Sequence, residues 1–357
     1  MEQQNIKERI IVYGIGDFYK DICDEIHERY EVAAYVDRNM QPRYGIEIST
    51  IEDVLSRPYD KILLTIINVR AYYEVIQMLV SRYRVHAERI LLGSMFQFEK
   101  NEISYNLQVG EKGNIILRQQ GISVTTRNID ELNNVLGIYA SNHYGYFLGQ
   151  KKEIVLDIGM NVGGAALFFA NMDSVEKVYA YEPFLETYIQ AEENIKQSCI
   201  GREKIQYFQY GISNRTEHRT IVYNAQMSCG QSTVQDKNSH ARENYQSWNL
   251  IAERDDKEEQ VLVKDIQEVL TEIYAEHKNK NIVLKMNCEG EEYGIFQRMD
   301  ECGLFDRVDL IMAEWHYDGK EHMTELLVKN GFMYWNIVMG PETGMLYAVN
   351  MGRRCTG

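Results

Sequence analysis

Prolines, closely spaced cysteines and long apolar runs are scarce in this chain of 357 residues. Only four prolines, with a hydrophobic fraction of 45%, describe a folded protein rather than a low-complexity chain. The six cysteines are scattered without a C-x-x-C pair, which argues against a zinc site or a disulfide framework and indicates reduced thiols. No apolar run approaches the roughly 18 residues of a membrane span, and the polar start MEQQNIKERI does not resemble a signal peptide. We therefore expect a cytoplasmic protein without a membrane span.

Positive charge is the scarcer sign in this chain. Lys and Arg number 38 against 53 Asp and Glu, which gives a formal net charge of −15 and a pI near 5.1. Proteins that bind a nucleic-acid backbone carry a basic footprint, so nucleic acid is not expected as the main partner. The length suits two domains, at roughly 100–200 residues per domain.

Residues 9–92 alternate between strand patterns and helix patterns. The expected strands are RIIVYG, VAAYVD, KILLTII and RILL, with helices near residues 16–29, 52 and 70–83 between them. Strands that alternate with helices imply a parallel sheet with right-handed crossovers. We therefore predict a small Rossmann-like domain over residues 1–98.

The turn after the first strand carries Gly14-x-Gly16, with Tyr19 where the dinucleotide fingerprint has its third glycine. Asp37 ends the second strand about 20 residues further on, where a ribose-binding acid is expected. This segment resembles the N-terminal domain of sugar acyltransferases that hold nucleotide sugars, and the extra domain of some sugar-modifying methyltransferases. Two interpretations stand side by side: a nucleotide-sugar or glycan-docking module, and a structural domain through which the chain forms a homo-oligomer.

The stretch IVLDIGMNVGG, residues 154–164, predicts a buried strand, a glycine-rich turn and a helix. Its apolar start suits a strand covered on both faces. Glycines in the turn let the chain bend sharply and let backbone N–H groups approach a ligand. The candidate cofactor-binding residues of this turn are Asp157, Gly159, Asn161 and Gly163.

The following strand, residues 177–181, delivers Glu182 at its C-terminal end. A carboxylate there can accept two hydrogen bonds from a ribose diol. Asp157 precedes the first glycine, an order that differs from the G-x-G-x-x-G of NAD sites and suits a ligand with a cationic amino-acid part. The pattern resembles motif I of the class I S-adenosylmethionine (SAM) methyltransferases, and Glu182 resembles their ribose-binding acid. An ordinary turn without a ligand is the alternative.

The rest of the chain continues the alternating pattern. A third strand leaves the sheet at Ser213, which joins the candidate cofactor-binding residues. Residues 217–263 break the rhythm with two antiparallel strands around a polar loop, and NIVLKMNCEG and VDLIMAEWH are the fourth and fifth strands. The segments MYWNIVM and GMLYAVN close the chain as a hairpin. Five strands plus this hairpin predict the seven-stranded Rossmann-like sheet of class I methyltransferases over residues 151–357.

Open α/β sheets bind ligands beyond the carboxyl ends of their strands, and four such ends carry polar groups here. Their segments DIGMNVGG, YEP, KMNCEGEE and AEWH, with a GIS exit and CGQST between, resemble the FkbM-type methyltransferases over about residues 125–350. The resemblance implies SAM as cofactor and O-methylation of a sugar or polyketide hydroxyl. The acceptor is then a small molecule or a glycan.

Two positions depart from the family pattern. Asn287 stands where the family has an aspartate, and Met160 where alanine is common. An asparagine makes only neutral hydrogen bonds, so any role of the aspartate as a base or metal ligand is lost here or passes to a neighbouring glutamate. Met160 should only reshape the pocket.

Methyl transfer from a sulfonium is an in-line displacement in which the protein aligns and desolvates the reactants. A hydroxyl acceptor needs a base or a metal to take its proton. His316 is our preferred base because a pKa near 6.5 suits proton transfer near neutrality. A histidine that merely hydrogen-bonds within its loop is the alternative.

The remaining candidate catalytic residues are Glu289, Glu314 and Asn287. Glu314 would orient His316 or contact the acceptor. Glu289 would bind acceptor hydroxyls with Lys285 as its partner, while Lys285 in a strand-face ion pair is an equal alternative. Glu289, Glu314 and His316 could surround a magnesium-like ion, but no segment has ligand spacing that demands one, so we predict no metal.

Residues 99–150 form a connector, in which NIILRQQ and SVTTRN are expected to be short strands and a helix is expected from about Asp130 to Ser141. In class I methyltransferases the segment before motif I often covers the cofactor, so four residues are lid candidates, with ordinary packing as the alternative for each: Tyr139, Asn142, His143 and Tyr144. Two other functions stay open for the chain. One is a nucleotide-dependent oxidoreductase that uses the Gly14-x-Gly16 turn, and the other is a SAM-binding scaffold without catalysis.

Overall fold

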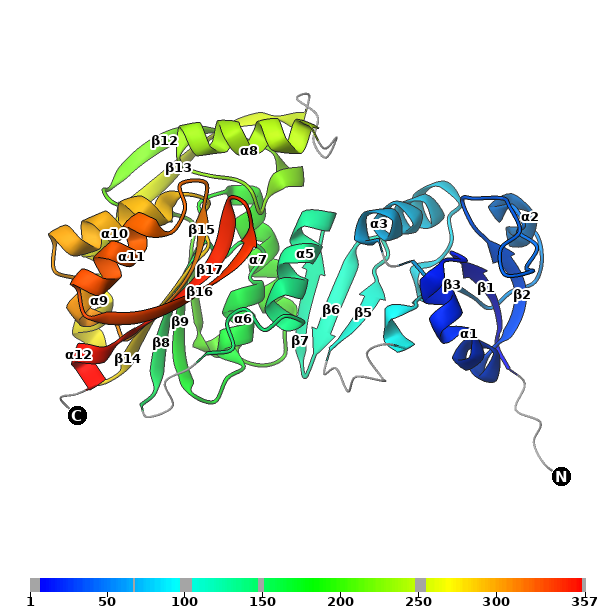
Figure 1. Cartoon of the computed structure of the whole chain (residues 1–357), viewed down its shortest axis with the longest axis horizontal. Coiled ribbons are helices and arrows are strands. Elements are labelled where there is room, and N and C mark those ends of the chain that lie inside the picture. Colours follow the sequence, from blue (N-terminus) through cyan, green and yellow to red (C-terminus); the bar gives the residue numbers. More distant parts are fainter. Residues whose placement is uncertain (1–6, 67, 97–104, 147–150, 248–254, 355–357) are drawn as a thin grey trace. The chain divides into compact units, whose positions relative to one another are not determined.

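The computed structural model describes residues 7–66, 68–96, 105–146, 151–247 and 255–354 (Figure 1). The chain divides into two compact units, residues 1–120 with 125–132, and residues 121–124 with 133–357. The division falls inside a strand, so it differs in detail from the predicted domain limits at residues 98 and 150, which stay predictions. No helix in the described ranges has both the length and the hydropathy needed to cross a membrane.

The N-terminal unit contains a four-stranded parallel sheet in the order β2-β1-β3-β4. Its strands are β1 (Arg9–Tyr13), β2 (Glu31–Val36), β3 (Lys61–Leu64) and β4 (Ile90–Leu92). The helices are α1 (Asp17–Arg29), α2 (Ile51–Leu55) and α3 (Val69–Gln77), the last continued by a π-helical turn (Met78–Arg82). Phe18, Ile22 and Ile26 lie four residues apart on α1 and are buried, which explains the helix. The predicted alternation of strands and helices is confirmed.

A three-stranded sheet follows, with β5 (Asn106–Val109), β6 (Ile115–Gln119) and β7 (Ile122–Thr126). The two short strands predicted in this region correspond to β6 and β7, whereas no strand was predicted at β5. The helix α5 (Ile129–Tyr139) lies where a helix is predicted.

The C-terminal unit is built on a seven-stranded sheet in the order β10-β9-β8-β14-β15-β17-β16. The parallel strands are β8 (Glu153–Ile158), β9 (Val175–Tyr181), β10 (Ile205–Phe208), β14 (Asn281–Met286) and β15 (Leu310–His316). The hairpin β16 (Phe332–Gly340) and β17 (Thr343–Asn350) adds the antiparallel edge. Every residue of β8 and β14 is buried, as their continuous apolar character predicts. The predicted seven-stranded sheet is confirmed.

Helices cover both faces of this sheet. Figure 1 shows α9 (Ile266–Glu276), α10 (Glu291–Glu301) and α11 (Glu321–Lys329) on one face, and α6 (Gly164–Ala170) and α7 (Leu185–Gln197) on the other. A short helix, α12 (Met351–Arg354), ends the described chain. Leu156, Leu284 and Ile311, from three adjacent strands, belong to one buried core. This core fixes where the strands end, and hence where their terminal side chains lie.

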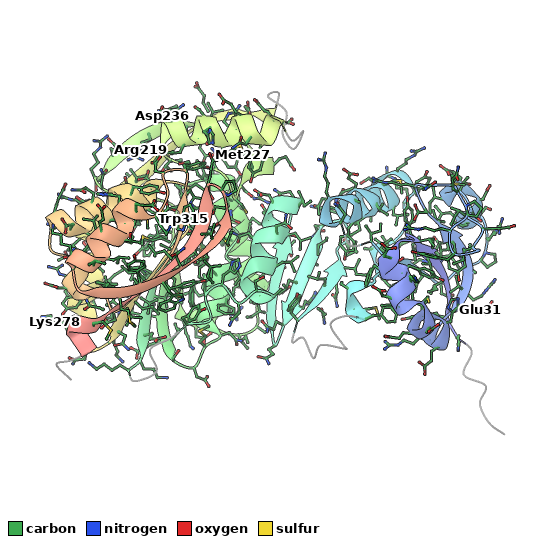
Figure 2. All side chains as sticks on the ribbon, viewed as in Figure 1. Glu31, Arg219, Met227, Asp236, Lys278 and Trp315 are labelled. Carbon is green, nitrogen blue, oxygen red and sulfur yellow. The ribbon has the colours of Figure 1, made fainter. Side chains whose placement is uncertain are left out.

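A small sheet in the order β11-β13-β12 stands beside the main one. Its strands are β11 (Gly211–Ser213), β12 (Glu217–Tyr223) and β13 (Lys257–Asp265), and β12 pairs antiparallel with β13 as predicted. The segment between them is not the predicted loop, because it contains the helix α8 (Gln235–Ser247). The helix lacks an apolar periodicity because polar side chains hold it in place. Asn238 is buried and donates to Val222 O, and Arg242 pairs with Asp256. Figure 2 shows Asp236 on this helix and Arg219 on the neighbouring strand.

Candidate active site

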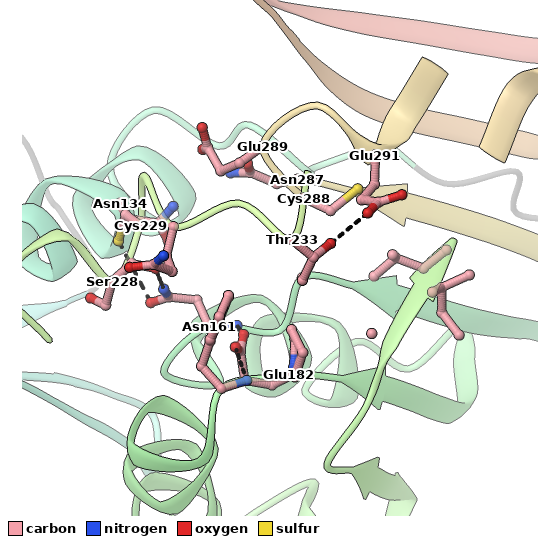
Figure 3. A pocket seen from close by; sticks show the side chains of 17 residues that line it. Asn134, Asn161, Glu182, Ser228, Cys229, Thr233, Asn287, Cys288, Glu289 and Glu291 are labelled. Atoms are coloured by element: carbon pink, nitrogen blue, oxygen red, sulfur yellow. Dashed lines mark hydrogen bonds between the residues drawn. The ribbon is translucent and has the colours of Figure 1, made fainter. Parts of the chain in front are cut away.

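A pocket lies at the carboxyl ends of β8, β9 and β14 in the C-terminal unit (Figure 3). Figure 3 shows Asn161 and Glu182 on one side of it and the segment from Asn287 to Glu289 on the other. Strand ends far apart in sequence thus meet at one edge of the sheet, as predicted. The polar residues that line the pocket are Asn134, Asn161, Glu182, Ser228, Gln231, Thr233, Asn287, Glu289 and Glu291.

The turn between β8 and α6 has the left-handed backbone that its glycines predict. Gly159 has φ 80°, and a Cβ atom there would lie 1.9 Å from the backbone oxygen of Asn287. Gly163 has φ 84° and precedes the first residue of α6. Asn161 also has a positive φ, of 50°, which asparagine tolerates better than most residues. Gly159 is therefore required by the contact between the exits of β8 and β14.

Glu182 lines the pocket from the end of β9. Its Oε2 accepts a hydrogen bond from Asn161 N–H at 2.9 Å, and its Oε1 accepts one from Phe184 N–H at 3.1 Å. The residue is 5% exposed, and burial raises the pKa of its carboxyl to about 7, while the two backbone N–H groups oppose the shift. Each carboxylate oxygen can accept a further hydrogen bond, so this group fits a ribose diol.

Asp157 lies beneath the turn, fully buried, and does not line the pocket. Its Oδ1 is 2.7 Å from Lys285 Nζ, which also donates a hydrogen bond to Gly159 O at 2.6 Å. Burial raises the pKa of Asp157, and the Lys285 ammonium opposes that shift. Lys285 thus pairs with Asp157 across β8 and β14, which confirms the strand-face alternative over a pair with Glu289. The ion pair joins the glycine turn to the KMNCEG segment.

Ser213 is also buried and belongs to a hydrogen-bonded network beside the pocket. Its hydroxyl donates to Glu291 Oε2 at 2.7 Å and accepts from Arg219 Nη2 at 2.9 Å. Glu291 pairs in turn with Arg219 and accepts a hydrogen bond from Thr233, which Figure 3 marks. Glu291 and Thr233 line the pocket, whereas Ser213 supports them from behind.

His316, at the end of β15, is surrounded by three carboxylates. Its Nε2 lies 3.2 Å from Glu289 Oε1 and 3.6 Å from Glu314 Oε1, and its Nδ1 lies 3.4 Å from Glu292 Oε1. Burial lowers the pKa of His316, but Glu289 and Glu292 more than offset this and hold it well above its usual value. The surrounding carboxylates therefore favour the protonated imidazole.

The three carboxylates differ in their environments. Glu292 accepts hydrogen bonds from Cys288 N–H and Gly290 N–H. Burial raises its pKa, but His316 and the bond from Cys288 N–H more than offset this and lower it. Glu314 also has a lowered pKa, because His316 outweighs its burial. Glu289 is the exception: burial raises its pKa despite His316. Its side chain is 13% exposed and lines the pocket, with Tyr317 donating to Oε2 at 3.2 Å.

Asn287 is held in one orientation. Its Nδ2 donates to Glu314 Oε2 at 2.8 Å, and Glu314 Oε1 accepts a hydrogen bond from Thr343 at 3.0 Å. The amide oxygen Oδ1 is buried and accepts no hydrogen bond from the residues that the structure describes. Within those residues, no group of three His, Cys, Asp or Glu side chains has the arrangement of a metal site. The predicted candidates Glu289, Glu314 and His316 are brought together, but as an ion-pair cluster.

The lid candidates are not among the residues that line the pocket. Tyr139 and Tyr144 are buried, and Tyr139 donates a hydrogen bond to Gly164 O. Tyr347 donates to the backbone oxygen of His143, and Asn142 is exposed. None of the four lines the pocket, whereas Asn134 of α5 does.

Several pocket residues had no predicted role, namely Asn134, Ser228, Cys229, Gln231 and Thr233. The last four belong to the segment that contains CGQST, which contributes to the family resemblance but indicates no role for its individual residues. Their place depends on long-range contacts, such as that between Asn161 Nδ2 and Ser228 O at 3.0 Å. Spacing along the chain does not report such contacts.

The sheet order and the polar strand ends define the Rossmann-like fold of a class I methyltransferase. Residues 157–334 match the family model described as the methyltransferase FkbM domain, and this part of the chain belongs to that family. The family supports SAM as the cofactor, as the sequence predicts. Residues 6–91 match a model described as C2185-like, N-terminal. No match is found among curated proteins.

Solved structures with a similar arrangement share little sequence with this chain. Methyltransferase FkbM from Methylobacillus flagellatus KT is 11% identical, covers 96% of this chain and 90% of its own, and has a TM-score of 0.38. Precorrin-6y C5,15-methyltransferase from Geobacter metallireducens GS-15 is 10% identical over 59% of this chain and 87% of its own, with a TM-score of 0.31. Magnesium protoporphyrin IX methyltransferase from Synechocystis PCC 6803, solved with bound SAM, is 9% identical over 61% and 77%, with a TM-score of 0.30.

Proposed function

We propose that the chain is a SAM-dependent O-methyltransferase that methylates a hydroxyl of a sugar, either in a small molecule or in a glycan. The observation that carries the proposal is the position of Glu289, whose carboxyl has a raised pKa and lines the same pocket as Glu182. One carboxyl is thus available for the cofactor and another for the acceptor. SAM would supply an electrophilic methyl group on a sulfonium.

Glu182 is assigned to the ribose of SAM. Its two oxygens are fixed by Asn161 N–H and Phe184 N–H and keep acceptor capacity toward the pocket. Asn161 and the glycines beside it shape the turn under the cofactor. Asp157 and Ser213 do not line the pocket and are assigned an indirect role. Asp157 pairs with Lys285, and Ser213 donates a hydrogen bond to Glu291.

Glu289 is assigned as the general base, in place of His316. A protonated imidazole has no lone pair for a further proton, so a cationic His316 cannot accept one. A carboxyl whose pKa is raised toward neutrality is suited to proton transfer. As the acceptor oxygen bonded to the methyl carbon, the bond from that carbon to sulfur would break and S-adenosylhomocysteine would leave. The hydroxyl proton would pass to Glu289, whose carboxylate His316 stabilises before transfer. His316 and Glu314 are then positioning residues.

Calorimetric titration and a transfer assay test this proposal. SAM and S-adenosylhomocysteine (SAH) should bind with one site per chain, and NADH should not bind. Labelled SAM offered with a panel of nucleotide sugars and oligosaccharides should place label on a hydroxyl. Binding of NADH without either SAM compound would instead support an oxidoreductase.

A SAM-binding scaffold without catalysis is the second candidate, and Asn287 is the observation that favours it. The neutral amide replaces the aspartate of the family pattern beside Glu314. In that case SAH would bind normally while no compound in the panel accepted label.

A further inference from the structure

A second cavity, of about 310 Å³, opens at the carboxyl ends of β1, β2 and β3 in the N-terminal unit. Residues from the turn Gly14–Gly16 and the pair Asp37 and Arg38 line it. In the order β2-β1-β3-β4, the chain adds β2 on one side of β1 and β3 on the other, which makes a topological switch point between β1 and β3. Open α/β sheets bind ligands at such a point. The methyl-transfer proposal assigns no role to this cavity.

The two glycines of the turn differ in why they are there. Gly14 has φ 105°, and a Cβ atom on it would lie 2.9 Å from Ile66 Cγ1. Gly16 has an ordinary extended backbone, with φ −89° and ψ −169°, and a Cβ atom on it would meet nothing within 4 Å. The fold therefore requires glycine at 14 but not at 16. A side chain at 16 would only occupy open space at the cavity wall, so its absence leaves room for a ligand.

Asp37 offers a carboxylate in a fixed position at the same wall. Its Oδ2 accepts a hydrogen bond from Ile15 N–H at 2.6 Å, and its Oδ1 accepts one from Asn39 N–H at 2.9 Å. Glu182 in the other unit has the same arrangement, because it accepts from Asn161 N–H in the turn after the preceding strand. Each oxygen of such a carboxylate can accept one further hydrogen bond, and a vicinal diol donates two.

The charges around the cavity disfavour a phosphate. Asp17 occupies the first turn of α1, the position where a helix N-terminus would otherwise bind an anion. Arg38 is already paired with Glu74 at 2.8 Å. A phosphate at this turn would face Asp17 and Asp37, and the described residues that line the cavity offer it no unpaired cation. The volume lies at the low end of the about 300–1,000 Å³ of small-molecule sites, which suits a nucleoside better than a dinucleotide.

We propose that this cavity binds a neutral ligand of nucleoside size through a vicinal diol that donates hydrogen bonds to Asp37. The proposal goes beyond methyl transfer and does not depend on it. It also differs from an NAD site, since Tyr19 is buried in α1 and hydrogen-bonds to Tyr35 where the dinucleotide fingerprint needs a glycine.

The test is calorimetric titration of the full chain, in saturating SAH, with uridine, cytidine, adenosine and guanosine. At least one nucleoside should bind with one site per chain. Its 2′-deoxy form should bind about tenfold more weakly or worse, because a hydrogen bond to a charged group is lost, and its 5′-monophosphate should also bind more weakly.

Three variants assign the binding to this cavity. Gly16→Val should abolish it and lower the unfolding temperature only slightly, because the extended backbone at 16 admits a side chain although valine is a poorer N-cap than glycine. Asp37→Asn should weaken it about tenfold or more. Asp60→Asn is the matched control, since Asp60 accepts a hydrogen bond from Arg9 N–H at the opposite end of the same sheet, and it should leave affinity within twofold.

Failure of all four nucleosides to bind would overturn the proposal. So would wild-type affinity in Gly16→Val, or tighter binding of the monophosphate than of the nucleoside. A chain that binds no SAH but binds a nucleoside in a manner sensitive to Gly16→Val would overturn the methyl-transfer proposal and leave this one standing.

Discussion

Replacing Asp157 by asparagine should weaken cofactor binding through Lys285 rather than through a lost cofactor contact. Lys285 is 3% exposed and Asp157 is fully buried, so the variant leaves a buried ammonium without its counter-ion. Removal of one partner of a buried pair costs roughly 3–5 kcal/mol. The Lys285 ammonium also holds Gly159 O, so the disturbance reaches the glycine turn and should raise the Kd of SAH about tenfold or more.

The double variant Asp157→Asn with Lys285→Met distinguishes positioning from direct contact. Replacement of both charges removes the unpaired ion, and such replacements are often close to neutral in stability. We expect the unfolding temperature and most of the SAH affinity to recover, as measured by thermal unfolding and calorimetry. The matched control is Asp265→Asn with Arg298→Met, an ion pair of 2.7 Å outside the pocket, which should leave SAH affinity unchanged. If the double variant binds SAH as weakly as Asp157→Asn alone, Asp157 does not act through Lys285, and a direct contact with the cofactor is indicated.

Three further predictions concern the pH dependence of the site. Because the pKa of Glu182 is about 7, SAH affinity should rise about tenfold between pH 6 and pH 8 as the carboxylate forms, and Glu182→Gln should bind weakly with no such rise. The pKa of His316 is raised in the folded state, so its contribution to stability is complete below pH 6.5 and is lost only as pH rises through that higher pKa. The unfolding temperature of His316→Gln should therefore lie below that of the wild type by a constant amount from pH 5 to 6.5. An unchanged unfolding temperature would contradict the ion-pair cluster. Asn287→Asp would place two carboxyls at the 2.8 Å of the present contact with Glu314, so the two groups must share one proton. The rate of methyl transfer by this variant should fall with rising pH, where the wild-type rate does not. Superimposable pH profiles would exclude this coupling.

The fold could be read from the sequence largely because its strands are continuous apolar runs. Residues 154–156 and 310–313 are buried on both faces, and a run of this kind needs no knowledge of its neighbours to be recognised. The helix α8 could not be found in this way. Its mean hydropathy is low, and its buried face is held by Asn238 and Arg242, whose partners are distant in the chain.

The candidate site was predicted in its location but not in its internal contacts. The glycine turn, Glu182 and the segment from Asn287 to Glu289 do line one pocket, because parallel strands end at the same edge. Sequence spacing could not place Lys285 against Asp157 rather than Glu289, since that choice depends on the register between β8 and β14, where the two residues are direct partners. Nor could it reveal the charge of His316, which depends on three carboxylates that only the fold assembles.

The role of Glu289 in methyl transfer is tested most directly by the rate of transfer from labelled SAM with the wild-type chain and with Glu289→Gln. The acceptors are a panel of nucleotide sugars and oligosaccharides, and Glu258→Gln, an exposed change on β13, is the matched control. We predict label on a sugar hydroxyl with the wild type and the control. Glu289→Gln should transfer about 10²–10⁴-fold more slowly, as loss of a general base implies, with SAH affinity within twofold. Transfer at the wild-type rate by Glu289→Gln, or no transfer to any acceptor by a chain that binds SAH, would contradict the account.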